Sequence, residues 1–63
     1  MDAKNKILKT LKDFGSLSSS RIAGIVGIDY NYATKLLEEL LSENKITKIE
    51  TPNSNYWRIK NGE

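Results

Sequence analysis

The spacing of apolar residues changes once along the chain, at Asn44, and this change constrains the fold more than any other feature. Before Asn44, apolar residues recur three and four positions apart, as on the buried face of an amphipathic helix. After it, apolar and polar residues alternate, as in a half-buried strand. The spacing predicts helices over 3–14, 18–26 and 29–43, then a β-hairpin over 46–60 with its turn at 51–55.

Residues suited to helix ends stand at the borders of these segments. Gly15 and Gly27 follow the first two helices, and glycine adopts the positive φ of a helix C-terminus without strain. Asn44 tolerates the same conformation after the third helix. Ser18 and Asp29 are the expected N-caps of the second and third helices, because their side chains accept backbone N–H bonds.

The chain is short, with 63 residues, and it contains no cysteine and no histidine. We expect one domain, residues 1–63. The missing residue types exclude disulfides, zinc-finger ligation, thiol nucleophiles and histidine acid–base chemistry. We therefore expect no enzyme, no metal and no cofactor. The core must form without such links, and it is expected to contain Leu11, Phe14, Ile22, Leu37, Leu40 and Trp57.

Neither a membrane span nor a secretory signal is visible in the sequence. No apolar run approaches the roughly 18 residues that cross a bilayer. Met1–Lys4 leads directly into a lysine-bearing segment, unlike a signal peptide. We expect a cytoplasmic protein with no membrane partner, and the absence of cysteine suits a reducing compartment.

The net charge of +2 hides a strong segregation of charge along the chain. Residues 1–12 and 45–60 each carry +3, whereas residues 36–44 carry −3. If the basic segments converge, the folded domain has a cationic face suited to a polyanion. We expect the basic ends to flank the third helix and the acidic stretch to lie on its far half.

The two central helices have the spacing of a helix-turn-helix. Ala23 and Gly27, four residues apart, supply a small residue for close helix crossing and a turn residue that tolerates positive φ. Apolar residues occupy the positions where the two helices and the core should meet: Ile22, Val26, Ile28, Ala33 and Leu36.

From Lys4 to Lys60, the chain resembles the winged helix-turn-helix domains of small bacterial and archaeal (or viral) regulators. The resemblance rests on Ala23-x-x-x-Gly27, on the leucine-rich third helix and on the final strand Tyr56-Trp57-Arg58-Ile59. It implies an α+β fold of three helices followed by a C-terminal hairpin wing, with Ser16-Leu17 as a short first strand. It also implies binding to double-stranded DNA, with the third helix (about 29–43) in the major groove and the wing (about 46–60) on the backbone or minor groove.

The polar face of the third helix holds the candidate base-reading residues. Asn can bond to adenine, Lys can reach guanine, and Thr can touch a thymine methyl group. Glu38 could accept from cytosine or orient a basic neighbour. The alternative is an ordinary solvated helix face. The candidates are Tyr30, Asn31, Thr34 and Lys35.

Candidate phosphate ligands stand at the start of the second helix and in the wing. A helix N-terminus offers free N–H groups to anions, although Ser18 is expected to act only as a cap. Asn and Ser in the wing are equally explained by turn formation, and Trp57 is expected in the core. The candidates are Ser19, Ser20, Arg21, Lys48, Asn53, Ser54, Asn55, Arg58 and Lys60.

Winged helices that bind Z-DNA also have a proline before a tryptophan in the wing, as Pro52 and Trp57 stand here. Their third helix reads left-handed DNA with an asparagine and a tyrosine one turn apart. Those positions are Thr34 and Glu38 in this chain, which argues against recognition of the Z form.

One alternative to regulation by DNA binding is a winged helix used for protein–protein contact in a transcription or replication assembly. Its basis is the low net charge together with Glu38, Glu39 and Glu43. A homodimer is a further possibility that the sequence allows. It would use the first helix or the C-terminal end of the third.

Overall fold

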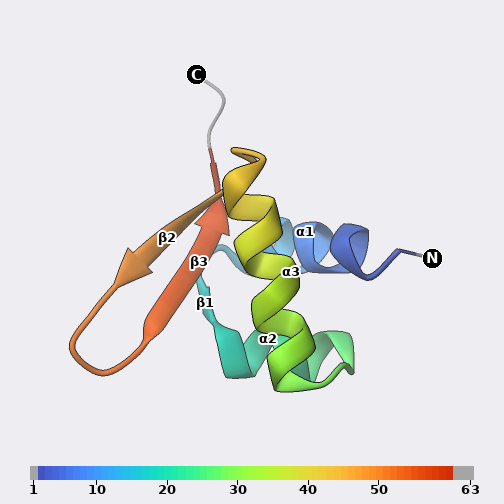
Figure 1. Cartoon of the computed structure of the whole chain (residues 1–63), viewed down its shortest axis with the longest axis horizontal. Coiled ribbons are helices and arrows are strands. Elements are labelled where there is room, and N and C mark those ends of the chain that lie inside the picture. Colours follow the sequence, from blue (N-terminus) through green and yellow to red (C-terminus); the bar gives the residue numbers. More distant parts are fainter. Residues whose placement is uncertain (1, 61–63) are drawn as a thin grey trace.

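The computed structural model describes residues 2–60, which form three helices and a three-stranded antiparallel sheet (Figure 1). This is the α+β arrangement predicted from the sequence. The predicted change at Asn44 is confirmed, because helices precede it and the hairpin follows it. In chain order the elements are α1 Ala3–Phe14, β1 Leu17–Ser18, α2 Ser19–Val26, α3 Tyr30–Ser42, β2 Ile46–Glu50 and β3 Asn55–Ile59.

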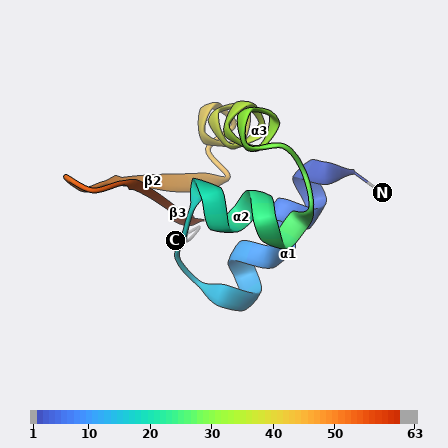
Figure 2. The same ribbon diagram turned by 90° about the horizontal axis from the view of Figure 1, so that it is seen from below.

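The sheet has the strand order β1-β3-β2, so the last strand lies in the middle. Leu17 pairs with Trp57, and Ile46 pairs with Ile59. The short first strand therefore exists, but it covers Leu17–Ser18 rather than Ser16-Leu17. The one-residue difference is set by the pairing with β3, in which Leu17 and Ser18 face Trp57 and Tyr56. Figure 2 shows the β2–β3 hairpin, which forms the wing, extending away from the three helices.

The predicted helix ends are confirmed. The Ser18 hydroxyl accepts from the backbone N–H of Arg21 at 3.3 Å, and the Asp29 carboxylate accepts from that of Asn31 at 2.9 Å. Gly27 has the left-handed conformation, and Asn44 has a φ of 63°. These signals are local, which is why the sequence predicts the helix boundaries to within a residue or two.

The core lies between the three helices and the inner face of the sheet. Trp57 and Ile46 enter it from the hairpin, and each is 1% exposed. One prediction is wrong: Phe14 is 59% exposed. It occupies the last position of α1, where the chain turns away at Gly15, so the other elements leave it uncovered. The buried cluster consists of Ile7, Leu11, Leu17, Ile22, Leu36, Leu37, Leu40, Ile46 and Trp57.

The basic N-terminal segment and the acidic end of α3 are joined directly. Lys4 Nζ lies 3.0 Å from Glu39 Oε1 and 2.9 Å from Glu43 Oε2. The hydrogen bond with Glu43, followed by that with Glu39, raises the pKa of Lys4. The same bond with Lys4 lowers the pKa of Glu43. Part of the positive charge of residues 1–12 is therefore neutralised by carboxylates on the surface of the same domain.

This ion pair predicts a pH dependence of stability. Because the folded pKa of Glu43 is lowered, its contribution is present above the ordinary glutamate pKa and is lost as pH falls through the folded value. Because the pKa of Lys4 is raised, its contribution is present below the ordinary lysine pKa and is lost only as pH rises through the higher folded value. Thermal unfolding between about pH 6 and about pH 3 should show the acid loss.

Lys4→Met should flatten that fall in stability, whereas Lys6→Met should preserve it. Lys6 is an exposed residue of the same helix and makes no ion pair within residues 2–60. Added salt should reduce the difference between the two variants, because the groups are on the surface. Equal acid profiles for both variants would contradict the assignment.

Candidate nucleic-acid interface

A polar cleft of about 250 Å³ forms where the starts of α2 and α3 meet the wing loop. Three separate segments of the sequence supply its lining, and six of the seven residues carry a side-chain amide or a serine hydroxyl. The cleft is lined by Ser18, Ser19, Ser20, Tyr30, Asn53, Ser54 and Asn55. The fold thus brings together most of the candidate phosphate ligands of α2 and of the wing loop beside the first residue of α3.

The candidate base-reading residues all stand on the first half of α3. Asn31 and Lys35 are exposed, and Tyr30 is 53% exposed. Thr34 is half-buried, and its hydroxyl donates to the carbonyl of Tyr30 at 2.9 Å. Three of the four side chains are therefore free to reach a ligand, while the hydroxyl hydrogen of Thr34 already serves its own helix.

Ser19 requires a correction, because it is a buried residue rather than a surface ligand. It is 7% exposed, and its hydroxyl oxygen accepts from the indole Nε1 of Trp57 at 2.7 Å. Ser20 and Arg21, the next two residues, are exposed. The register of α2 decides this difference, since one residue of the turn faces the sheet and its neighbours face solvent. The Ser19–Trp57 bond joins the start of α2 to the middle strand of the wing.

Ser19→Ala should lower the free energy of unfolding by about 1–3 kcal/mol, because it leaves the buried indole N–H without an acceptor. Ser20→Ala is the matched control, and we expect a change within about 0.5 kcal/mol because that residue is exposed. Chemical denaturation followed by circular dichroism measures both. If the two variants unfold alike, the buried bond does not stabilise the domain.

Lys48 is held by carboxylates of the same domain. Its Nζ lies 3.4 Å from Glu38 and 3.7 Å from Glu50, and 5.4 Å from the centre of the Trp57 ring. Its side chain is 23% exposed. Glu38 thus orients a basic neighbour on the wing, one of the two roles considered for it. A phosphate would have to compete with two carboxylates for this lysine.

Hydrogen bonds within the wing loop define its shape. The Thr51 hydroxyl donates to the carbonyl of Ser54 at 2.6 Å and accepts from its N–H at 3.0 Å. This closure leaves Asn53 and Asn55 exposed at the cleft. The role of Thr51 was not predicted, although a threonine that begins a Thr-Pro-Asn-Ser turn is a recognisable signal for such bonds.

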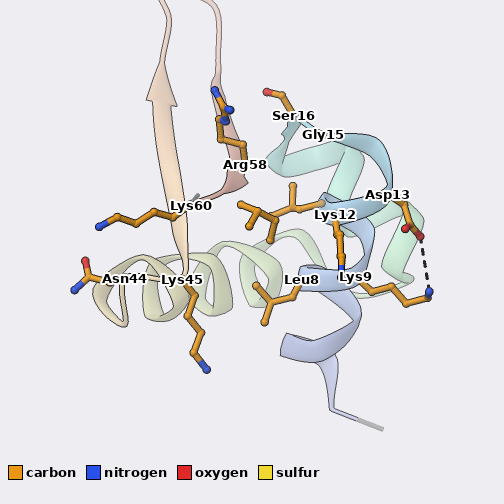
Figure 3. Close-up of a pocket in the computed structure, with 12 residues that line it drawn as sticks. Leu8, Lys9, Lys12, Asp13, Gly15, Ser16, Asn44, Lys45, Arg58 and Lys60 are labelled. Carbon is orange, nitrogen blue, oxygen red and sulfur yellow. Dashed lines mark ion pairs between the residues drawn. The ribbon is translucent and has the colours of Figure 1, made fainter. Parts of the chain in front are cut away.

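None of the three wing cations, Lys48, Arg58 and Lys60, lines the cleft. Arg58 and Lys60 line a separate groove near the base of the wing, together with residues of α1 (Figure 3). Arg58 alternates with Trp57 along β3, so it belongs to the sheet face that turns away from the core. The predicted phosphate ligands are therefore divided between two surfaces of the domain.

Acidic side chains do not gather into a metal site in the part of the chain that the structure describes. Within the same residues, no helix combines the length and the apolar character needed to cross a membrane.

No described protein family and no curated protein matches the sequence. Solved structures do resemble the fold. The Zalpha domain of PKZ from Carassius auratus, solved in complex with Z-DNA, is 21% identical with a TM-score of 0.86, and the match covers 90% of each chain. A mutant MarR from E. coli, solved with operator DNA, is 17% identical with a TM-score of 0.88, covering 98% of this chain and 46% of that one.

A third neighbour is the transcriptional regulator PcaV from Streptomyces coelicolor, solved with its natural ligand. It is 16% identical with a TM-score of 0.88, and the match covers 97% of this chain and 45% of PcaV. This chain thus spans less than half the length of the two regulators and nearly all of the Zalpha domain. Three helices, the β1-β3-β2 sheet and these likenesses together establish that the chain has the winged helix-turn-helix fold.

Proposed function

We propose that this protein binds double-stranded DNA as a sequence-specific transcriptional regulator. The first half of α3 would enter the major groove through Tyr30, Asn31, Thr34 and Lys35. Phosphates would bind to Ser20 and Arg21 at the start of α2 and to Asn53, Ser54 and Asn55 of the wing. The convergence of the α2 start, the α3 start and the wing loop at one polar cleft carries this proposal.

The distribution of charge supports the same orientation. Lys35 and Arg21 are exposed near the cleft elements, whereas the carboxylates of Glu39 and Glu43 lie toward the other end of α3 and are paired with Lys4. A DNA backbone near the start of α3 therefore meets Arg21, Lys35 and the amides of the wing loop, together with a single carboxylate, Asp29, which accepts from the backbone N–H of Asn31. Backbone N–H groups at the start of α2 add to the attraction for phosphate.

The neighbours also favour DNA as the partner, since two of them were solved with DNA. The MarR-type regulators are more than twice as long as this chain, so their extra segments have no counterpart within these 63 residues. A homodimer on a palindromic site therefore remains part of the proposal, and it would use α1 or the C-terminal end of α3.

Binding to a pool of random duplexes tests the proposal. Mobility shifts should show complexes at low salt that weaken steeply as salt rises, because lysine and arginine contacts release counterions from the backbone. Selection of the bound sequences should then yield a preferred site. A complete absence of binding at low salt, or binding unaffected by salt, would overturn the proposal.

The same experiment should include a left-handed duplex. The Zalpha domain was solved with Z-DNA, and its match to this protein covers 90% of each chain. We expect weaker binding to the left-handed duplex than to right-handed DNA. Glu38 stands where Z-DNA-binding winged helices carry a tyrosine, and here it is an exposed carboxylate paired with Lys48. Tighter binding to the Z form would contradict sequence-specific reading of right-handed DNA. It would indicate that the protein recognises the shape of left-handed DNA.

A further inference from the structure

A second hollow lies on a different part of the domain from the polar cleft. It is a groove of about 1110 Å³ between the second half of α1, the end of β3 and the turn from α3 to β2. None of its lining residues lines the cleft at the starts of α2 and α3. DNA bound as proposed above leaves the function of this groove unexplained.

Positive charge surrounds the groove. Five of its lining residues are Lys9, Lys12, Lys45, Arg58 and Lys60, against a single carboxylate, Asp13. Figure 3 shows Lys45 and Lys60 on one side of Leu8 and Lys9 and Lys12 on the other.

The few ion pairs at the groove are weak. Lys9 approaches Asp13 at 3.9 Å, and Lys45 approaches Glu43 at 3.7 Å. Both lysine side chains are more than half exposed, and such pairs contribute little. Lys12, Arg58 and Lys60 make no ion pair within residues 2–60. The groove therefore has an excess of positive charge available to a ligand.

The floor of the groove is apolar. Leu8, Leu11 and Ile59 line it, and Leu8 and Ile59 are half-buried at the edge of the core. An apolar floor inside a cationic rim matches a ligand that carries both aliphatic and acidic side chains. A nucleic-acid backbone would use the rim and leave the floor uncovered.

The edge of β3 adds a third feature. On the side of β1, only Tyr56 and Trp57 have strand partners, whereas β2 pairs with the full length from Asn55 to Ile59. Beyond Trp57, no strand within the described residues covers this edge at Ile59, which lines the groove together with Gly15 and Ser16, the two residues before β1. An unpaired strand edge can pair with an extended peptide through main-chain hydrogen bonds.

We propose that this groove binds an extended acidic segment of a partner protein. Its carboxylates would pair with Lys12, Lys45 and Lys60, and its aliphatic side chains would cover Leu8 and Ile59. Its backbone would lie against the edge of β3 at Ile59, beyond the end of β1. Glutamates of a second copy fit less well, because Glu39 and Glu43 lie on a helix and are already paired with lysines.

The test uses a fluorescent peptide of about ten residues that alternates glutamate with leucine, in which acids and aliphatic groups lie on opposite faces of a strand. Anisotropy should show saturable binding that weakens with salt. A peptide alternating glutamate with serine keeps the charge and should bind at least about tenfold more weakly, because it cannot cover the floor. Equal binding of the two peptides would contradict a role for the apolar floor.

Charge reversal locates the binding site. Lys12→Glu and Lys45→Glu should each lower the affinity for the glutamate–leucine peptide by about tenfold or more. Lys6→Glu is the matched control on α1, because Lys6 is exposed and does not line the groove. It should change the affinity by less than about threefold. Thermal melts of the three variants verify folding, and an equal loss of affinity in all three would overturn the proposal.

Chemical-shift mapping separates this proposal from DNA binding at the cleft. The peptide should shift amide resonances of Lys12, Ile59 and Lys60, and duplex DNA should shift those of Ser20, Asn31 and Asn53. Lys12→Glu should keep its affinity for DNA. Groove resonances that respond to DNA would assign the groove to nucleic acid instead. Concentration-dependent dimerisation that is lost in Lys12→Glu would assign it to a second copy, and either result overturns the proposal.

Discussion

Trp57→Ala should destabilise the domain by about 3–5 kcal/mol, the usual cost of removing a large buried aromatic side chain. Trp57 is 1% exposed and belongs to the cluster that joins the sheet to all three helices. Its loss also removes the donor that bonds to Ser19. A domain of this length has only roughly 3–9 kcal/mol of total stability. We therefore expect the variant to lose about a third or more of the stability of the domain, as measured by circular dichroism and denaturant titration.

Tyr56→Ala is the matched control for this prediction. Tyr56 precedes Trp57 on the same strand, but it is on the opposite face of the sheet and is 38% exposed. We expect a cost of about 1 kcal/mol or less, mainly from lost contact with the cross-strand neighbour Ile49. If Tyr56→Ala unfolded the domain as strongly as Trp57→Ala, the assignment of the two sheet faces would be wrong.

Lys35→Ala should reduce DNA affinity at the preferred site by about 1–3 kcal/mol and relax sequence preference there. The side chain is exposed on the first half of α3, among the residues proposed to read bases. The experiment is competitive selection from a duplex library, followed by titration on the preferred site and on a random duplex. Loss of a base contact should lower the affinity for the preferred site and leave the affinity for the random duplex unchanged.

Arg21→Ala provides the contrast. Arg21 is exposed at the start of α2, where a phosphate contact is proposed. Its loss should weaken binding to all sequences alike and reduce the slope of log affinity against log salt by about 1. Lys6→Ala, on the exposed face of α1, should do neither. If Lys35→Ala behaved like Arg21→Ala, the base-reading role of Lys35 would be wrong, while DNA binding itself would stand.

Local sequence signals account for how well the helices were predicted. The N-caps Ser18 and Asp29 and the positive-φ residue Gly27 act within one turn of the chain, so their neighbours in sequence contain the needed information. The helical spacing of the leucines in α3 works in the same way, because the period of apolar residues reflects a single helix face. The exact start of β1 depends on a partner nearly 40 residues away and was missed by one residue.

Assignments that depend on more than one element were less successful. Phe14 has helical spacing with Ile7 and Leu11, yet no neighbouring element covers the end of α1. Ser19 looked equivalent to Ser20, but the register of α2 turns it toward Trp57. Whether Lys48 is free depends on Glu38, which is ten residues away on another element.

The sequence alone determined the type and order of the elements, the winged-helix resemblance and the exclusion of cysteine and histidine chemistry, because composition, periodicity and capping are local properties. Only the tertiary structure decided which charges share a surface. It paired Lys4 with the acidic end of α3, tied Lys48 to Glu38 and separated Arg58 and Lys60 from the polar cleft. The physical reason is that a surface is assembled by packing distant segments, and the sum of charges along a segment does not specify the direction of each side chain.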